Sequence, residues 1–328
     1  MFKAPIVRLL FIVALILPCG MALAEEAPKD AQVKKPAATS FIRVLRDDDK
    51  QPIALQTATV RYVAASDEGE LIVDLIGVVH IGDKKYYRQL NKQFAQYDVL
   101  LYELVARPED RVPRKDRRGD NPLSMLHKLM NVVLDLDSQM DHIDYTKQNF
   151  VHADLSPEEM AKAIRERGDD QMTLMLSVAA DLLRQQNLQQ LKQERQEADP
   201  DAEPAEEFQL TDVLELLTDP SGPVKLKRMF AEQFANEGDL AQGLGKTISQ
   251  ILIDDRNKAA MKIFQKEMAK GKKRIGIFYG AAHMPDFEKR LTSDFGLKRK
   301  TVTWQTAWNL QPPMQTSGLE RLLKLLED

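Results

Sequence analysis

Residues 71–79 (LIVDLIGVV) form a nearly uninterrupted apolar stretch, which places the strongest constraint on the fold. A strand of this composition has no polar face to turn toward water, so it is typical of a sheet that helices cover on both sides. The β-like stretch 57–64 precedes it, separated by the turn-like sequence Ser66-Asp67-Glu68-Gly69. Two strands around such a turn predict a hairpin whose second arm is buried on both faces.

A helix and another strand follow this hairpin. Apolar residues in 83–96 recur at helical spacing, and 98–104 (DVLLYEL) is a further apolar stretch. Strand, helix and strand within about thirty residues make a βαβ unit, which implies parallel strands in an α/β sheet. We therefore expect strand 98–104 to lie beside strand 71–79.

The C-terminal part of the chain repeats this order of elements. A long helical pattern covers 244–269, and it is followed by a short apolar strand at 274–279 (RIGIFY), a short helix at 285–291 and an alternating strand at 300–308. Strands that alternate with helices at both ends of the chain predict one sheet to which both ends contribute.

The middle of the chain, about 118–240, has a different pattern. It contains helical patterns at 123–136 and 172–188 and no clear strand. We interpret it as a helical insertion that covers one edge of the sheet. The predicted fold class is therefore α/β, with a mixed sheet built from N- and C-terminal βα units and a central helical insertion.

The first 24 residues have the pattern of a secretory signal peptide. Lys3 and Arg8 supply positive charge, residues 9–17 (LLFIVALIL) are apolar throughout, and Ala22-Leu23-Ala24 places small residues before a cleavage site. An uncleaved anchor is the alternative, but the apolar run is far shorter than the ~20 residues of a spanning helix. We expect 1–24 to be removed, leaving a periplasmic or secreted protein with no stable membrane span.

Composition then limits the chemistry of the mature protein. Cleavage removes the single cysteine, Cys19, so any metal ion must sit on His, Asp, Glu or backbone oxygen. The formal net charge of −4 argues against a nucleic-acid-binding protein, because such proteins usually carry a basic field. We interpret residues 25–40 as a flexible linker and 41–328 as the folded domain.

Two of the five histidines have matching surroundings. Gly77-Val78-Val79-His80 ends the strand of the first βα unit, and Gly280-Ala281-Ala282-His283 ends the strand of the second. The carboxyl ends of parallel strands open onto the crevice where α/β proteins bind ligands, so we expect His80 and His283 to converge there. The alternative is two histidines that cap strand ends by hydrogen bonding.

Glu103 and Arg256 are expected at the same place. Glu103 ends the buried strand 98–104, and Arg256 falls within the apolar face of the helix at 244–269. A buried carboxylate needs a partner, a proton or a metal ion, and a guanidinium that faces the core needs an anion such as Glu103 or a substrate carbonyl. Two His and one carboxylate are a recurrent hydrolytic metal set. The alternatives are a solvated carboxylate and an internal ion pair.

The remaining histidines, His127, His142 and His152, are expected to have structural roles. After His152, Ser156 and Pro157 predict a helix start, with Ser156 as the N-cap and Pro157 at the first helical position. The chain has no Walker-type phosphate loop, no HExxH, no G-x-S-x-G elbow and no Cys nucleophile.

Taken together and in order, these motifs resemble the TraB/PrgY/GumN family, which includes the TIKI proteins. The resemblance is carried by GVVH at 77–80, YDVLLYEL at 97–104, DRN at 255–257 and YGAAH at 279–283. NFVHAD at 149–154 is also similar to bacterial members, and the match spans most of 57–308.

The resemblance implies a mixed α/β domain with one site, which in the TIKI branch is linked to metal-dependent proteolysis of secreted proteins with manganese or cobalt. Carried over to this chain, it implies that His80, Glu103 and His283 hold a divalent ion (Mn, Co or Zn). Arg256 would stabilise charge on the substrate, and Glu103 and Arg256 would be the catalytic residues. The expected function is an exported metal-dependent hydrolase, most directly a peptidase that acts on peptides or secreted proteins.

Two other functions stay open at this point. A non-catalytic protein would sequester a peptide or small ligand in the same cleft, because Arg and His bind carboxylates readily. A metal-free, esterase-like site would use one His as general base. Ligand binding without turnover would favour the first, and activity that survives a strong chelator would favour the second.

Overall fold

The computed structural model describes residues 40–64, 71–112, 133–166, 218–236, 253–311 and residue 317. The predicted signal peptide, residues 25–39 of the predicted linker, most of the helical pattern at 123–136, the pattern at 172–188, residues 244–252 of the pattern at 244–269 and His127 lie outside the described residues. Within the described ranges, no helix is both long and apolar enough to cross a membrane.

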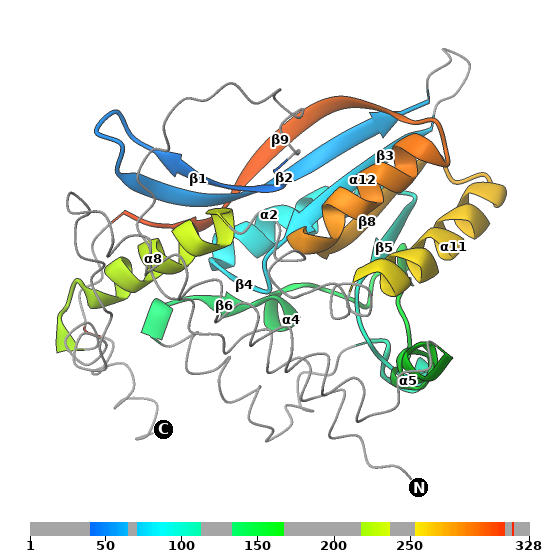
Figure 1. Ribbon diagram of the computed structural model, residues 1–328, viewed down its shortest axis with the longest axis horizontal. Coiled ribbons are helices and arrows are strands. Elements are labelled where there is room, and N and C mark those ends of the chain that lie inside the picture. The colour runs from blue at the N-terminus through cyan, green and yellow to red at the C-terminus, as the bar shows by residue number, and fades with distance from the viewer. Residues whose placement is uncertain are drawn as a thin grey trace, which may run out of the picture.

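A seven-stranded mixed sheet forms the centre of the molecule (Figure 1), and its order is β1-β2-β3-β8-β5-β7, with β9 paired to β2. β2 pairs antiparallel with β1, β3 and β9. The neighbours β3–β8, β8–β5 and β5–β7 pair parallel. The strands of this sheet are β1 (Ile42–Arg46), β2 (Pro52–Val63), β3 (Ile72–Val78), β5 (Val99–Tyr102), β7 (Phe150–His152), β8 (Arg274–Gly280) and β9 (Lys298–Asn309). The α/β fold class predicted from the sequence is confirmed.

Helices cover both faces of this sheet, and each face has its own apolar core. On one face, α2 (Lys84–Phe94) packs the side chains of Tyr86, Tyr87, Leu90 and Phe94 against Ile76, Leu100 and Phe278. On the other face, α11 (Asp255–Ala269) and α12 (Met284–Ser293) pack against Val73, Leu75, Ile275 and Ile277. β3 is therefore buried on both faces, as its apolar sequence predicts.

The remaining described elements are short or peripheral. A second, two-stranded sheet joins β4 (Ile81–Gly82) to β6 (Asp137–Ser138), directly after His80. The other helices are η1 (Pro108–Asp110), α4 (Gln139–His142), α5 (Pro157–Glu166), α8 (Gly222–Asn236) and η3 (Ala281–His283).

The predicted neighbour of β3 is wrong. The hairpin of β2 and β3 forms as expected, but β5 pairs with β8 instead of with β3, and β8 lies between them. The central strand of the parallel group must bury both faces, and β8 does so from its second residue onward. Gly276 also allows close packing, because a Cβ there would lie 2.5 Å from Leu100 Cδ1. Strand order depends on this packing between distant segments, which local periodicity does not record.

The middle of the chain also contains strands that its sequence pattern did not predict. β6 and β7 both lie within 118–240, and β7 extends the main sheet beyond β5. These strands are two and three residues long, too short for alternation to be recognised.

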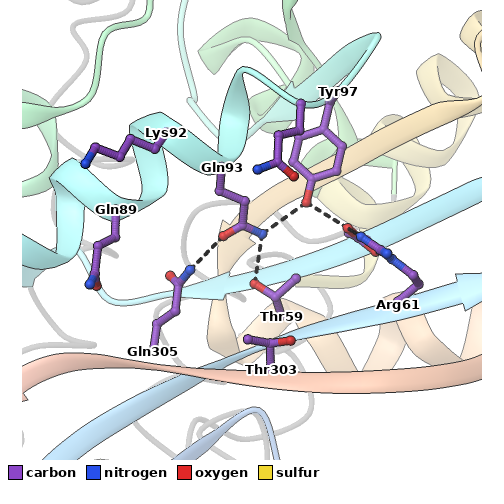
Figure 2. Close-up of a pocket in the computed structure, with 10 residues that line it drawn as sticks. Thr59, Arg61, Gln89, Lys92, Gln93, Tyr97, Thr303 and Gln305 are labelled. Atoms are coloured by element: carbon purple, nitrogen blue, oxygen red, sulfur yellow. Dashed lines mark hydrogen bonds and ion pairs between the residues drawn. The ribbon is translucent and has the colours of Figure 1, made fainter.

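A polar groove of about 340 Å³ lies between α2 and strands β2 and β9 (Figure 2). Gln305 donates a hydrogen bond to Gln93 (2.8 Å), which donates to the Tyr97 hydroxyl (3.0 Å). Tyr97 and Arg61 in turn donate to Asp74, each at 2.8 Å. Because a carboxylate only accepts, every donor in this series of hydrogen bonds points toward Asp74. They fix the start of β3, opposite the end that carries His80.

Candidate active site at the strand ends

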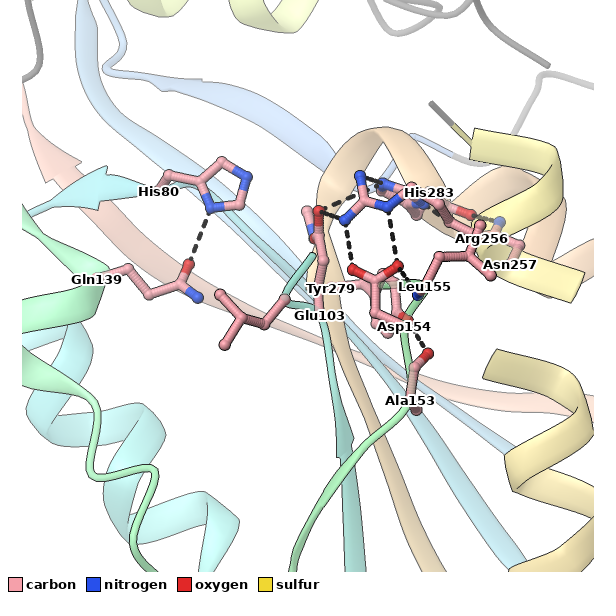
Figure 3. A network of polar contacts seen from close by, with 12 residues as sticks. His80, Glu103, Gln139, Ala153, Asp154, Leu155, Arg256, Asn257, Tyr279 and His283 are labelled. Atoms are coloured by element: carbon pink, nitrogen blue, oxygen red, sulfur yellow. Dashed lines mark hydrogen bonds and ion pairs between the residues drawn. The ribbon is translucent and has the colours of Figure 1, made fainter. Parts of the chain in front are cut away.

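The carboxyl ends of three parallel strands bring the predicted site residues together (Figure 3). β3 ends at Val78 and leads to His80, β5 ends at Tyr102 and leads to Glu103, and β8 leads through η3 to His283. The register pairs Val78 with Gly280 and Tyr102 with Phe278, so the three strands end within two residues of one another. Both histidines therefore lie at the crevice that an α/β sheet opens to ligands.

Glu103 lies at the centre of this arrangement. Its Oε1 accepts a hydrogen bond from Arg256 Nη2 at 2.6 Å, and its Oε2 accepts one from the Gly280 backbone N–H at 2.7 Å. Burial alone raises the pKa of Glu103, but the charge of Arg256 is the largest of several effects that together outweigh burial and hold the pKa below its ordinary value. Glu103 is therefore ionised at neutral pH.

Arg256 lies on the buried face of α11, as predicted, and its side chain is 4% exposed. It faces Glu103 and also Asp154, whose two oxygens accept from Nε at 3.0 Å and Nη2 at 2.7 Å. Burial lowers the pKa of Arg256, and the two carboxylates raise it above its ordinary value. Of the anions considered from the sequence, Glu103 is present, and Asp154 joins it.

His283 is buried and held by the residue that follows Arg256. The Asn257 side chain donates to the His283 carbonyl oxygen at 3.0 Å, while Asn257 Oδ1 lies 2.7 Å from His283 Nδ1. The other ring nitrogen, Nε2, lies 3.6 Å from Glu103 Oε1 and 3.5 Å from Arg256 Nη1. Burial lowers the pKa of His283 to about 4, so the ring is neutral at pH 7.

His80 approaches from the other side and is exposed to solvent. Its Nδ1 lies 3.2 Å from Gln139 Oε1, and its carbonyl oxygen accepts from the Gln139 backbone N–H at 2.9 Å. A Cβ on Gly280 would lie 3.4 Å from His80 Nε2, 3.4 Å from Glu103 Oε2 and 3.8 Å from His283 Cδ2. The three side chains thus surround the space over Gly280.

The chemistry of this donor set fits a divalent cation. Two imidazoles and a carboxylate are ordinary ligands for such ions. Two carboxylates, Glu103 and Asp154, face one guanidinium, which leaves a net negative charge beside the space over Gly280. Among the described residues, no group of three or more His, Cys, Asp or Glu side chains has the geometry of a metal site.

The other described histidines have the structural roles expected of them. His142 Nε2 pairs with Asp137 at 2.9 Å, and His152 Nε2 donates to the Leu104 carbonyl oxygen at 2.6 Å. The predicted N-cap is confirmed. Ser156 accepts from the Glu159 backbone N–H, and Glu159 accepts in return from that of Ser156, which is a capping box at the start of α5.

Three polar residues of the site were given no role from the sequence: Gln139, Asp154 and Asn257. Asp154 follows the three-residue strand β7, and Gln139 begins the four-residue helix α4. Asn257 had a local signal, because it follows Arg256 on the buried face of α11. An amide in an apolar helical face needs partners as an arginine does.

Comparison of the chain with models of protein families, with curated proteins and with solved structures finds no match.

Proposed function

We propose that this protein is an exported, metal-dependent hydrolase of the TraB/PrgY/GumN kind, with peptides or exported proteins as substrates. The observation that carries the proposal is the convergence of His80 Nε2, Glu103 Oε2 and the His283 ring around Gly280, within 3.4–3.8 Å of one position. Export is proposed from the signal-peptide pattern of residues 1–24.

His80, Glu103 and His283 would hold the ion. A divalent ion supplies Lewis acidity, which polarises a carbonyl group and acidifies water. Glu103 is ionised and His283 is neutral at pH 7, and these are the states in which both offer lone pairs to a cation.

Arg256 has two roles in this proposal. It holds the Glu103 carboxylate in place through a 2.6 Å ion pair. Its Nη1 also lies 3.5 Å from His283 Nε2, so its positive charge acts on the space where a substrate carbonyl gains negative charge. Asp154 orients the guanidinium through two further hydrogen bonds.

The same contacts count against the two other functions. Arg256 is engaged by Glu103 and Asp154, so capturing a ligand carboxylate would cost it an existing ion pair. His283 has a pKa of about 4, which makes it a weak general base at neutral pH, so a metal-free site would depend on His80 as its base. Neither the sequestering protein nor the metal-free esterase is favoured by a specific contact.

The first experiment measures metal content of residues 25–328 by elemental analysis after loading with Mn, Co or Zn, with and without chelator. We expect about one ion per chain, lost in His80→Ala. His142→Ala is the matched control, since it removes a histidine whose Nε2 pairs with Asp137 and contacts none of the proposed ligands. Hydrolysis of a peptide library is then measured for the loaded protein. Absence of metal under every loading condition would overturn the proposal.

A further inference from the structure

The orientation of the Asn257 amide is fixed by its acceptors. Nδ2 donates to the His283 carbonyl oxygen at 3.0 Å and to Asp286 Oδ2 at 2.9 Å, and neither acceptor can donate. Oδ1 must therefore face His283 Nδ1, at 2.7 Å. An amide oxygen only accepts, so Nδ1 carries the ring proton and Nε2 keeps its lone pair. Arg256 Nη1, which can only donate, lies 3.5 Å from His283 Nε2.

Gln139 makes the corresponding contacts with His80. Its Nε2 donates to the Tyr145 hydroxyl at 2.8 Å, and its Oε1 lies 3.2 Å from His80 Nδ1. The Gln139 backbone N–H also holds the His80 carbonyl oxygen, which joins α4 to the end of β3 at two points. The Gln139 side chain is buried, and its amide carries both hydrogen bonds without solvent.

Two segments far apart in the sequence thus each place an amide oxygen within hydrogen-bond distance of a histidine Nδ1, one at His80 and one at His283. Gln139 comes from the middle of the chain and Asn257 from α11. We propose that Gln139 and Asn257 are positioning residues that fix both imidazoles in the Nδ1–H tautomer. Each Nε2 then keeps its lone pair, that of His80 beside the space over Gly280 and that of His283 beside Glu103 Oε1. The neighbour of a ring nitrogen sets the tautomer of a histidine, and metal ligands are commonly oriented in this way.

The inference rests on the proposed site, but the tautomers are measured without metal. Nitrogen-15 NMR of the metal-free protein reports which ring nitrogen carries the proton. We expect His80 and His283 both to be protonated at Nδ1 alone. A wild-type spectrum with Nε2–H at either histidine would overturn the proposal, whatever metal the protein binds.

Two substitutions of Gln139 separate positioning from folding. Gln139→Met keeps the size and removes the acceptor, so we expect mixed tautomers at His80 and metal affinity lower by about 10–100-fold. Gln139→Glu restores an acceptor for Nδ1–H, and the Tyr145 hydroxyl, which accepts from Gln139 Nε2 in the wild type, can donate to the new carboxylate. The tautomer and the metal affinity should therefore return toward wild type. An unchanged His80 tautomer in Gln139→Met would contradict the role of Gln139. Fixed tautomers in a protein that binds no metal would support positioning while the hydrolase proposal fails.

Discussion

Arg256 and Asp154 form a two-point ion pair in the interior, with Nε 3.0 Å from Oδ1 and Nη2 2.7 Å from Oδ2. The Asp154 side chain is 0% exposed. Asp154 follows β7 at the edge of the sheet and Arg256 belongs to α11, so the pair connects the middle of the chain to its C-terminal part.

Breaking this pair should destabilise the protein strongly. Asp154→Leu leaves the buried Arg256 with Glu103 as its carboxylate partner, and removal of one member of a buried pair costs about 3–5 kcal/mol. Urea denaturation measures the loss. The control is Glu158→Gln, which breaks the exposed pair with Arg107 and should cost less than about 1 kcal/mol. Equal losses in the two variants would show that Asp154 does not anchor Arg256.

Gly280→Ala should abolish metal binding without unfolding the protein. The φ angle of Gly280 is −51°, which any residue adopts. The new Cβ would contact His80 Nε2 and Glu103 Oε2 at 3.4 Å and occupy the space between the proposed ligands. The measurement is metal affinity by titration calorimetry, beside thermal unfolding.

Gly271→Ala serves as the control, because it should lower stability and leave metal binding unchanged. Gly271 has φ +81° and open space around its Cβ position, so alanine is strained there without meeting a neighbour. We expect a loss of about 1 kcal/mol in stability and unchanged metal affinity. Full metal binding by Gly280→Ala would place the ion elsewhere.

The two histidines should differ in their contribution to stability. His80 is exposed, so water can replace its ring at Gln139 Oε1, and His80→Ala should remove metal binding at only a small cost in the free energy of unfolding of the metal-free protein. His283 is buried, and its removal strands Asn257 Oδ1, which costs about 1–3 kcal/mol in addition. Chemical denaturation without metal compares them. A greater loss in His80→Ala than in His283→Ala would contradict this arrangement.

Acidification should destabilise the protein partly through His152. Burial lowers the pKa of His152 below the ordinary value of about 6.5. The unfolded chain therefore binds a proton at a higher pH than the folded chain does, so the free energy of unfolding falls as pH drops below about 6.5, until the folded pKa is passed.

His152→Gln tests that contribution. The Gln amide keeps a donor for the Leu104 carbonyl oxygen and does not titrate. Urea denaturation between pH 7 and pH 5 should show a shallower loss of stability in the variant. Identical slopes in both proteins would mean that His152 binds protons equally in the folded and unfolded states.

Much of the site could be predicted from local sequence. His80, Glu103 and His283 each follow an apolar strand, and Arg256 lies in a helical face, so each signal lies within a few residues of its position. Asp154 and Gln139 had no comparable signal, because β7 and α4 are only three and four residues long.

The sequence by itself determined that β3, β5 and β8 are buried, where they end and which side chains follow those ends, because hydrophobic periodicity is local. Only the tertiary structure decided that β8 separates β3 from β5 and that Asp154 neutralises Arg256. It also decided that Gln139 and Asn257 hold the two imidazoles. Those choices depend on packing and hydrogen bonding between residues far apart in the chain, where each buried polar group takes the partner that the completed fold brings to it.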